Sequence, residues 1–318
     1  MTENTDRTIE EDLYLMHCTL CPRACGVNRM EGETGRCGET AKIRAGLAWL
    51  HQWEEPCLTG KNGSGAVFFS GCSLGCIFCQ NYVLSRREGD NAGVEGERVS
   101  LTEEQLADVF LRLEAKGAAN INLVTACHFI PQVSNALTDA KRQGLSIPVV
   151  YNSSGYESVS SLKMLEGLVD IWLPDFKYMD PSIAKAYSGA PDYPDAAKAA
   201  IREMVRICGG REYNGEGIMT RGVIVRHMLL PGHVSDSKKI LKWLHETFGE
   251  RILISVMNQY TPMPAVRDDP LLSRRVTRRE YGRLLEYALE IGIEDGFFQE
   301  GKAAEQSFVP RFDGSGLI

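Results

Sequence analysis

Three cysteines crowd into the stretch FFSGCSLGCIFCQN, residues 68–81, as Cys72, Cys76 and Cys79. Thiolates at such short spacings in a Gly-containing loop can wrap one face of a cubane iron–sulfur cluster without a regular helix. A four-iron cluster normally takes four thiolates, so three leave one iron with an open coordination position, which is where a substrate or cofactor binds. The alternative is a structural zinc site that a distant His or Cys completes.

A second group of cysteines lies in CTLCPRACGVNRMEGETGRC and comprises Cys18, Cys21, Cys25 and Cys37. Four thiolates form a closed ligand set, which predicts a structural zinc or a fully ligated second iron–sulfur cluster, and the spacing fits both. Three further cysteines stand apart from both groups. One of them, Cys208, lies on the apolar face of a predicted helix, so we expect it in the core.

Six short apolar runs, each bounded by turn residues, predict the buried strands that must position these cysteines. They are AVFFS (66–70), NINLVT (120–125), IPVVYN (147–152), VDIWLP (169–174), GVIVRHMLL (222–230) and RILISVM (251–257). Amphipathic segments separate them, such as residues 100–117, where Ser100 with Glu103 resembles a helix capping box. This alternation implies parallel strands joined by right-handed crossovers, in an open doubly wound sheet or in a full or partial barrel. Functional side chains then gather where strands end.

The composition is that of a globular protein with a sizeable core, with 318 residues, 43% hydrophobic content and a net charge of −7. The acidic balance argues against nucleic acid or an anionic membrane as a partner. The N-terminal residues carry acids and no apolar run of signal-peptide length, so we expect a cytoplasmic protein. Gly and Asn cluster at residues 58–65, and we expect a Cys-rich metal-binding region at 1–62 and the main domain at 63–318.

The cysteine loop resembles the radical S-adenosylmethionine (radical SAM) superfamily. CSLGCIFC matches the cluster signature, in which the aromatic before the last cysteine corresponds to Phe78. CQN, residues 79–81, is similar to the activating-enzyme branch, typified by pyruvate formate-lyase activating enzyme. With WEEP, HMLLPG and MNQYTP, the chain looks closest to a poorly characterised group of activating-enzyme-like iron–sulfur proteins.

The resemblance implies a partial (β/α)6 barrel and a 4Fe-4S cluster held by Cys72, Cys76 and Cys79 as the catalytic centre. S-adenosylmethionine is then expected to chelate the fourth iron and to be cleaved reductively to a 5′-deoxyadenosyl radical that abstracts hydrogen. A glycyl-radical enzyme is the substrate that the family favours, with an external one-electron reductant such as flavodoxin or ferredoxin. A peptide or small-molecule substrate is an alternative, and a non-catalytic iron–sulfur or zinc electron-transfer module is another.

The resemblance also implies cofactor contacts at the strand ends. The expected residues are Phe78, Thr125, Ala126, Asn152, Ser154, Asp175, Lys177 and Arg226. Thr125 and Ala126 stand where the family has a Gly-Gly-Glu-like turn and offer backbone groups. Asn152 and Ser154 are expected to bond ribose hydroxyls or to cap a turn.

Asp175 and Lys177 resemble the D-x-K motif of activating enzymes. Lys177 is expected to neutralise the cofactor carboxylate and Asp175 to hold a cation or the ammonium, with a surface ion pair as the alternative. Arg226 is a second carboxylate or ribose contact, and His227 faces the other side of its strand.

Three other sites remain open between chemistry and packing. Cys127 and His128 offer a hydrogen-atom donor and an acid or base, or they are a packed thiol and a hydrogen-bonded imidazole. Residues 258–260 offer uncharged polar groups that face substrate or cap a strand. Glu54 and Glu55 are expected to be surface acids unless the N-terminal region brings them to the barrel mouth.

Overall fold

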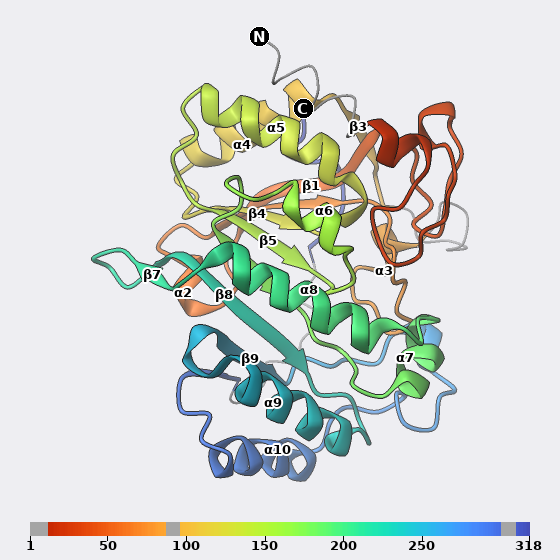
Figure 1. The fold of residues 1–318 in the computed structure, drawn as a ribbon, viewed down its shortest axis with the longest axis vertical. Coiled ribbons are helices and arrows are strands. Elements are labelled where there is room, and N and C mark those ends of the chain that lie inside the picture. The colour runs from red at the N-terminus through yellow and green to blue at the C-terminus, as the bar shows by residue number, and fades with distance from the viewer. Residues whose placement is uncertain (1–11, 87–95, 300–309) are drawn as a thin grey trace.

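The computed structural model describes residues 12–86, 96–299 and 310–318, and a ten-stranded sheet lies at its centre (Figure 1). Its strands are β1 (Ile43–His51), β2 (Ser64–Phe69), β3 (Val99–Leu101), β4 (Ile121–Val124), β5 (Val149–Ser153), β6 (Ile171–Pro174), β7 (Glu212–Tyr213), β8 (Met219–Met228), β9 (Leu253–Met257) and β10 (Gly296–Phe298). They follow the order β10, β9, β8, β6, β5, β4, β2, β1 and β3, with β7 paired to β8.

The six predicted strands are confirmed as β2, β4, β5, β6, β8 and β9, which are parallel neighbours in chain order. A doubly wound sheet reverses its direction of growth at a switch point, whereas here each new strand joins the same edge. The fold is therefore an α/β barrel and not a doubly wound sheet. Within the described segments β3 and β10 end the sheet without pairing to each other, so the barrel is partial.

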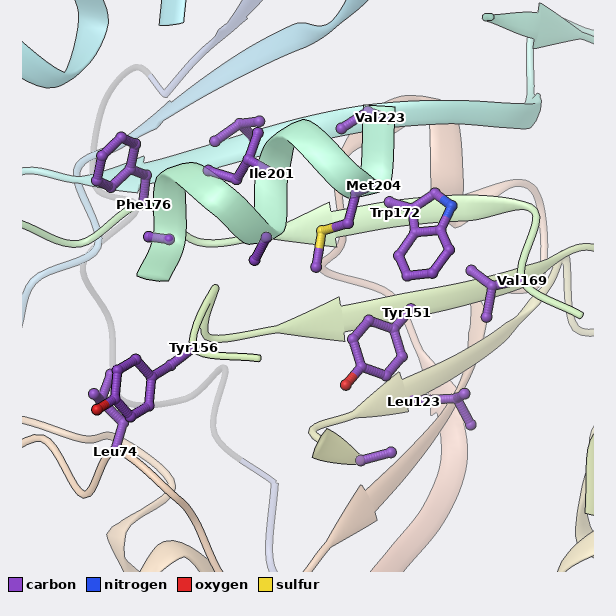
Figure 2. Close-up of a cluster of buried hydrophobic side chains, with 14 of the residues drawn as sticks. Leu74, Leu123, Tyr151, Tyr156, Val169, Trp172, Phe176, Ile201, Met204 and Val223 are labelled. Carbon is purple, nitrogen blue, oxygen red and sulfur yellow. The ribbon is translucent and has the colours of Figure 1, made fainter. Parts of the chain in front are cut away.

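Helices cover the outer face of the curved sheet (Figure 1). They are α4 (Glu103–Ala115), α5 (Ile130–Arg142), α6 (Val159–Lys163), α8 (Tyr193–Cys208), α9 (Val234–Phe248) and α10 (Arg278–Glu290). Figure 2 shows Ile201 and Met204 of α8 against Trp172 and Val223 of the sheet, and Cys208 is buried as predicted. None of the helices in the described part of the chain is long and apolar enough to cross a membrane.

The capping box of α4 differs from the predicted one. Thr102 accepts a hydrogen bond from the backbone of Gln105, and the Gln105 side chain accepts one from the Thr102 backbone. Ser100 instead belongs to β3, where it pairs with Arg44 of β1. The short strand thus displaces the helix start by two residues relative to the pattern.

Alternate residues of the parallel strands face the inside of the barrel. An apolar cluster fills its amino end and joins Val150, Ile171, Leu173, Ile224 and Leu253 to Cys57 and Leu58 of α2 (Pro56–Thr59). β1 runs antiparallel to β2, with His51 opposite Ser64 at the first residue of β2. The chain after β1 therefore enters the barrel from its amino end, opposite to α3 (Tyr82–Ser85) and α7 (Pro181–Ser188) in Figure 1.

The N-terminal cysteine-rich region lies against the carboxyl ends of the strands (Figure 1). Arg29 is buried and donates to the backbone oxygen of His128 at 2.6 Å, in the short 3-10 helix that follows β4. Arg23 donates to the backbone oxygens of Ser73 at 3.0 Å and Ser188 at 2.8 Å. β1 precedes the boundary that we expect at residues 62 and 63 and pairs with β2, and the boundary stays a prediction.

Candidate active site

The cysteine loop follows β2 directly, at the carboxyl end of the barrel, and leads into α3. Cys76 is buried, whereas Cys72 and Cys79 are half-buried. Gly71 opens the loop at a φ of +80°, and a Cβ there would lie 2.8 Å from the backbone oxygen of Cys37. Only glycine fits this close approach between the loop and the N-terminal region.

Each sulfur of the loop accepts at least one hydrogen bond. Cys72 Sγ accepts from the backbone nitrogens of Leu74 and Gly75, both at 3.4 Å. Cys76 Sγ accepts from Ser188 Oγ at 3.1 Å, and Cys79 Sγ accepts from Ser85 Oγ at 3.3 Å. Donors aimed at sulfur favour the thiolate, which is the form that binds iron.

Burial favours the protonated form of Cys72 and Cys79. It raises the pKa of Cys72, and it raises the pKa of Cys79 to about 12, with the neighbouring cysteines adding to both shifts. Lys177 acts in the opposite direction on both thiols. These effects indicate that the three sulfurs lie close enough to interact electrostatically. A positive metal centre beside them would instead favour the thiolate forms.

Phe78 anchors the loop in the core. Its ring meets Tyr178, Tyr187 and Tyr260 nearly edge to face, at centroid distances of 6.3, 6.3 and 6.1 Å. The backbone nitrogen of Ile77 donates to the backbone oxygen of Tyr187 at 2.9 Å. These contacts hold the part of the loop that carries Cys76 and Cys79, which flank Phe78 in the sequence.

A cavity of about 310 Å³ lies inside the barrel beside the cysteine loop. Seven of the predicted site residues line it, namely Cys76, Phe78, Cys79, Asn152, Asp175, Lys177 and Arg226. Gln259 and Gln80 line it as well, and Gln80 Nε2 donates to the backbone oxygen of Gln259 at 3.2 Å.

The remaining predicted contacts lie outside the lining of this cavity. Ala126 is fully buried, and Ser154 Oγ is buried without a hydrogen-bond partner among the described residues. Thr125 is half-buried. Their expected roles toward a cofactor stay predictions, as do the roles of the residues that line the cavity.

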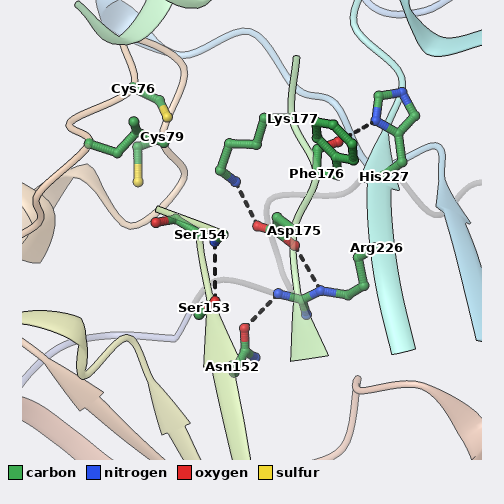
Figure 3. A network of polar contacts seen from close by, with 12 residues as sticks. Cys76, Cys79, Asn152, Ser153, Ser154, Asp175, Phe176, Lys177, Arg226 and His227 are labelled. Atoms are coloured by element: carbon green, nitrogen blue, oxygen red, sulfur yellow. Dashed lines mark hydrogen bonds and ion pairs between the residues drawn. The ribbon is translucent and has the colours of Figure 1, made fainter. Parts of the chain in front are cut away.

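A network of charges crosses the cavity wall (Figure 3). Lys177 Nζ lies 2.6 Å from Asp175 Oδ2, and Arg226 Nε lies 2.9 Å from Asp175 Oδ1. Arg226 Nη2 also donates to Asn152 Oδ1 at 2.6 Å. Burial opposes ionisation of Asp175, but Arg226 and Lys177 outweigh it and lower the pKa of the carboxyl. The alternative of a surface ion pair is wrong, because the charged groups are 15–20% exposed inside the barrel.

Glu54 and Glu55 are not surface acids. The side chain of Glu54 is 8% exposed, Glu55 is 8% exposed, and both line the cavity. Because β1 is antiparallel to β2, the segment after it reaches the barrel from the amino end, so the two acids lie below the mouth. Sequence periodicity cannot reveal this placement, since it depends on the pairing of β1 with β2.

Cys127 and His128 are buried in hydrogen-bonded positions next to the loop. Cys127 Sγ lies 3.2 Å from Ser73 Oγ, and His128 Nε2 lies 2.5 Å from the backbone oxygen of Ser70. Burial, with a smaller effect of Arg29, lowers the pKa of His128 to about 3, so the ring is neutral. Neither residue lines the cavity.

The four N-terminal cysteines lie within electrostatic reach of one another. Burial raises the pKa of Cys21 to about 12, and Cys37, Cys18 and Cys25 each add to the shift. Cys25 is exposed, and its sulfur accepts from the Arg36 backbone at 3.3 Å. Across the described residues, no three His, Cys, Asp or Glu side chains are gathered into a group that could hold a single metal ion.

No family model matches the chain. A relative, the uncharacterised protein MJ0674 of Methanocaldococcus jannaschii, is 27% identical over 279 residues, which are 87% of this chain and 76% of the relative.

Several solved structures are similar to part of the chain. Streptococcus suis SuiB bound to S-adenosylmethionine is 14% identical, with 72% of this chain and 48% of that chain covered and a TM-score of 0.45. HydG, a maturase of FeFe-hydrogenase, is 16% identical, with coverage of 73% and 50% and a TM-score of 0.48. A domain of pyruvate-formate lyase-activating enzyme from Bacteroides vulgatus is 12% identical, with coverage of 54% and 91% and a TM-score of 0.38. The chain spans about half the length of the SuiB and HydG chains. At these scores the likenesses assign no function.

Proposed function

We propose that the chain is a radical SAM enzyme in which Cys72, Cys76 and Cys79 hold a 4Fe-4S cluster and the adjoining cavity binds S-adenosylmethionine. The observation that carries the proposal is that two of the three loop cysteines, Cys76 and Cys79, line a charged cavity inside a parallel barrel. In this proposal the cluster iron that has no cysteine ligand would be open to a cofactor bound in the cavity.

The loop residues fit such a cluster in their chemistry. Every sulfur accepts a hydrogen bond, and hydrogen bonds to sulfur are one of the means by which proteins set cluster potentials. The cysteines of a cubane cluster bind different iron atoms, so they need not converge on one point as the ligands of a single ion must. When bound, the cluster would supply the electron that cleaves S-adenosylmethionine to methionine and the 5′-deoxyadenosyl radical that abstracts hydrogen.

The cavity residues have separate roles in this proposal. Lys177 neutralises the cofactor carboxylate as a point charge, and Asp175 holds Lys177 and Arg226 in place through its two oxygens. Arg226 in turn orients Asn152, whose amide offers hydrogen bonds to hydroxyl groups. The buried wall around Phe78 excludes water and stray hydrogen donors from the reacting atoms.

We further propose a protein substrate of the glycyl-radical type, on the basis of the CQN sequence that follows the cluster motif. An external one-electron reductant such as flavodoxin or ferredoxin would serve the cluster. Mixing the reduced, reconstituted protein with candidate glycyl-radical partners tests this substrate class. We expect a glycyl-radical signal in electron paramagnetic resonance, and cleavage of the cofactor without that signal in any partner would exclude it.

A further inference from the structure

The floor of the cavity is built by a segment to which the proposed chemistry gives no task. Four residues line it, namely His51, which is the last residue of β1, and Trp53, Glu54 and Glu55, which precede α2. They lie toward the amino end of the barrel, opposite the cysteine loop. A polar floor in an otherwise apolar barrel end needs a partner, because buried polar groups without one are costly.

Glu54 has its partners within the protein. Its Oε1 accepts from Asn122 Nδ2 at 2.9 Å and from Asn152 Nδ2 at 3.5 Å. Its Oε2 lies 3.5 Å from Arg226 Nη1. Both oxygens of this carboxylate are therefore engaged with the wall of the cavity.

Glu55 has an oxygen left over. Its Oε2 is buried and has no hydrogen-bond partner among the described residues, and the same is true of His51 Nδ1. Burial lowers the pKa of His51 to about 4, so the ring is neutral and does not compensate a carboxylate. Two unpartnered polar atoms thus lie on one floor.

When Glu55 is ionised, three carboxylates (Glu54, Glu55 and Asp175) face two cations (Lys177 and Arg226) in the lining of the cavity. Lys177 and Arg226 are paired with Asp175, and Arg226 also with Glu54, whereas Glu55 forms no ion pair among the described residues. Burial raises the pKa of Glu55 to about 7, against the opposing effect of Arg226. A cation beside Glu55 would complete the balance and favour the ionised carboxylate.

Trp53 marks where the cavity reaches the surface. The residue is 59% exposed, yet it lines the same cavity as Glu55. An indole face attracts cations, more strongly than other aromatic rings do. An exposed indole next to two buried acids is a combination that recognises an ammonium or guanidinium group.

We propose that Glu55, with Glu54 and Trp53, forms a subsite that binds an alkylammonium or guanidinium group of the substrate. This assignment rests on the proposed radical function, since that function makes the cavity a substrate site. The group comes from a small amine or from a Lys or Arg side chain of a peptide, which share this chemistry.

Binding of n-butylammonium to the full chain, measured by saturation-transfer nuclear magnetic resonance, tests the subsite without any turnover. n-Butanol is the neutral probe of similar shape. We expect n-butylammonium to bind at least tenfold more tightly than n-butanol. N-acetyl-lysine amide serves as the peptide arm: tighter binding than n-butylammonium indicates a peptide source, and weaker binding indicates a small amine.

Two variants locate the binding. Glu55→Gln keeps the shape of the side chain, and we expect it to weaken n-butylammonium binding at least tenfold. Glu157→Gln is the matched control, because Glu157 is also buried with one unpartnered oxygen but lies outside the cavity. Trp53→Leu, at an exposed position that folding tolerates, is expected to weaken binding at least threefold and decides the question should Glu55→Gln not fold.

Three results would overturn the subsite. They are equal affinity for n-butylammonium and n-butanol, equal affinity of the wild type and Glu55→Gln, and displacement of n-butylammonium by S-adenosylmethionine, which would assign the acids to the cofactor. Formation of 5′-deoxyadenosine is measured separately. If no 5′-deoxyadenosine forms, the proposed function is contradicted. The subsite is judged separately, from the binding measurements alone.

Discussion

At the scale of single residues, the sulfur ligands are shaped by side chains far away in sequence. Ser188 lies 112 residues after Cys76 and donates to its sulfur, while its hydroxyl also meets Tyr178 Oη at 2.8 Å. No motif marks this serine, because its role arises only when α7 folds against the loop. In the structure, Ser188 is the last residue of α7 and is buried together with Ala184 and Tyr187.

Replacing Ser188 with alanine removes one hydrogen bond from Cys76 Sγ. Such a bond stabilises the more negative, reduced cluster, so we expect the reduction potential to fall by roughly 30 to 60 mV. A redox titration followed by electron paramagnetic resonance measures the shift. Ser182→Ala in the same helix is the control, since Ser182 is bonded to Asp180 and not to a sulfur. An identical potential in both variants would argue against a role for Ser188.

Lys177 gives a second prediction at this scale. Lys177→Met removes the charge that we assign to the cofactor carboxylate, and the loss of a charge-assisted hydrogen bond corresponds to roughly 1.5 to 3 kcal/mol. We expect the dissociation constant for S-adenosylmethionine to rise about 10-fold to 100-fold, as measured by equilibrium dialysis. Lys141→Met, which removes a Lys–Asp contact of 3.9 Å on the surface, should leave it unchanged. Unaltered affinity in Lys177→Met would remove Lys177 from the site.

At the scale of elements, strand periodicity explains how much of the site could be foreseen. In β8, Arg226 faces the cavity and His227 faces the helices, as the period of two predicts. The short apolar runs also marked each parallel strand, so Asp175 and Lys177 could be placed at a strand end. β1 could not be predicted in this way, because its glycine and arginine interrupt the apolar pattern. The positions of Glu54 and Glu55 depend on β1, so they could not be predicted either.

His227 connects β8 to the elements around it and makes stability depend on pH. Its Nδ1 donates to the Phe176 oxygen at 2.7 Å, and its Nε2 lies 2.8 Å from Ser237 Oγ of α9. Burial, partly offset by the bond to Phe176, lowers the pKa of the ring to about 4. As the pH falls, His227 of the unfolded chain is protonated near pH 6.5, whereas His227 of the folded chain stays neutral down to about pH 4. The contribution of the neutral ring to the free energy of unfolding is therefore complete above pH 6.5 and is lost as the pH falls toward 4.

A comparison of wild type with His227→Gln measures this contribution. Other titrating groups cancel in the difference, and the variant lacks the loss on acidification. We expect the difference in unfolding free energy to shrink by roughly 1 kcal/mol between pH 6 and pH 5, in urea denaturation at each pH. A difference that stays constant over this range would mean that the ring protonates equally well in the folded state.

At the scale of the whole molecule, the barrel joins two cysteine sets that the sequence already separated into open and closed. Arg23 spans them, because it lies between Cys21 and Cys25 and donates to the backbone oxygens of Ser73 and Ser188. Cys76 and Cys79 of the loop line the cavity, whereas Cys18, Cys21, Cys25 and Cys37 lie outside its lining. The two cysteine groups can be recognised from their spacing, but the contacts between the two regions are long-range and have no local signature.

The radical chemistry is the central claim, and one measurement tests it most directly. The protein is reconstituted anaerobically with iron and sulfide, reduced, and given S-adenosylmethionine, and 5′-deoxyadenosine is quantified for the wild type and for Cys76→Ala. We predict nucleoside product from the wild type and none from Cys76→Ala. Absence of product from a fully reconstituted wild type, or equal product from the variant, would contradict the account.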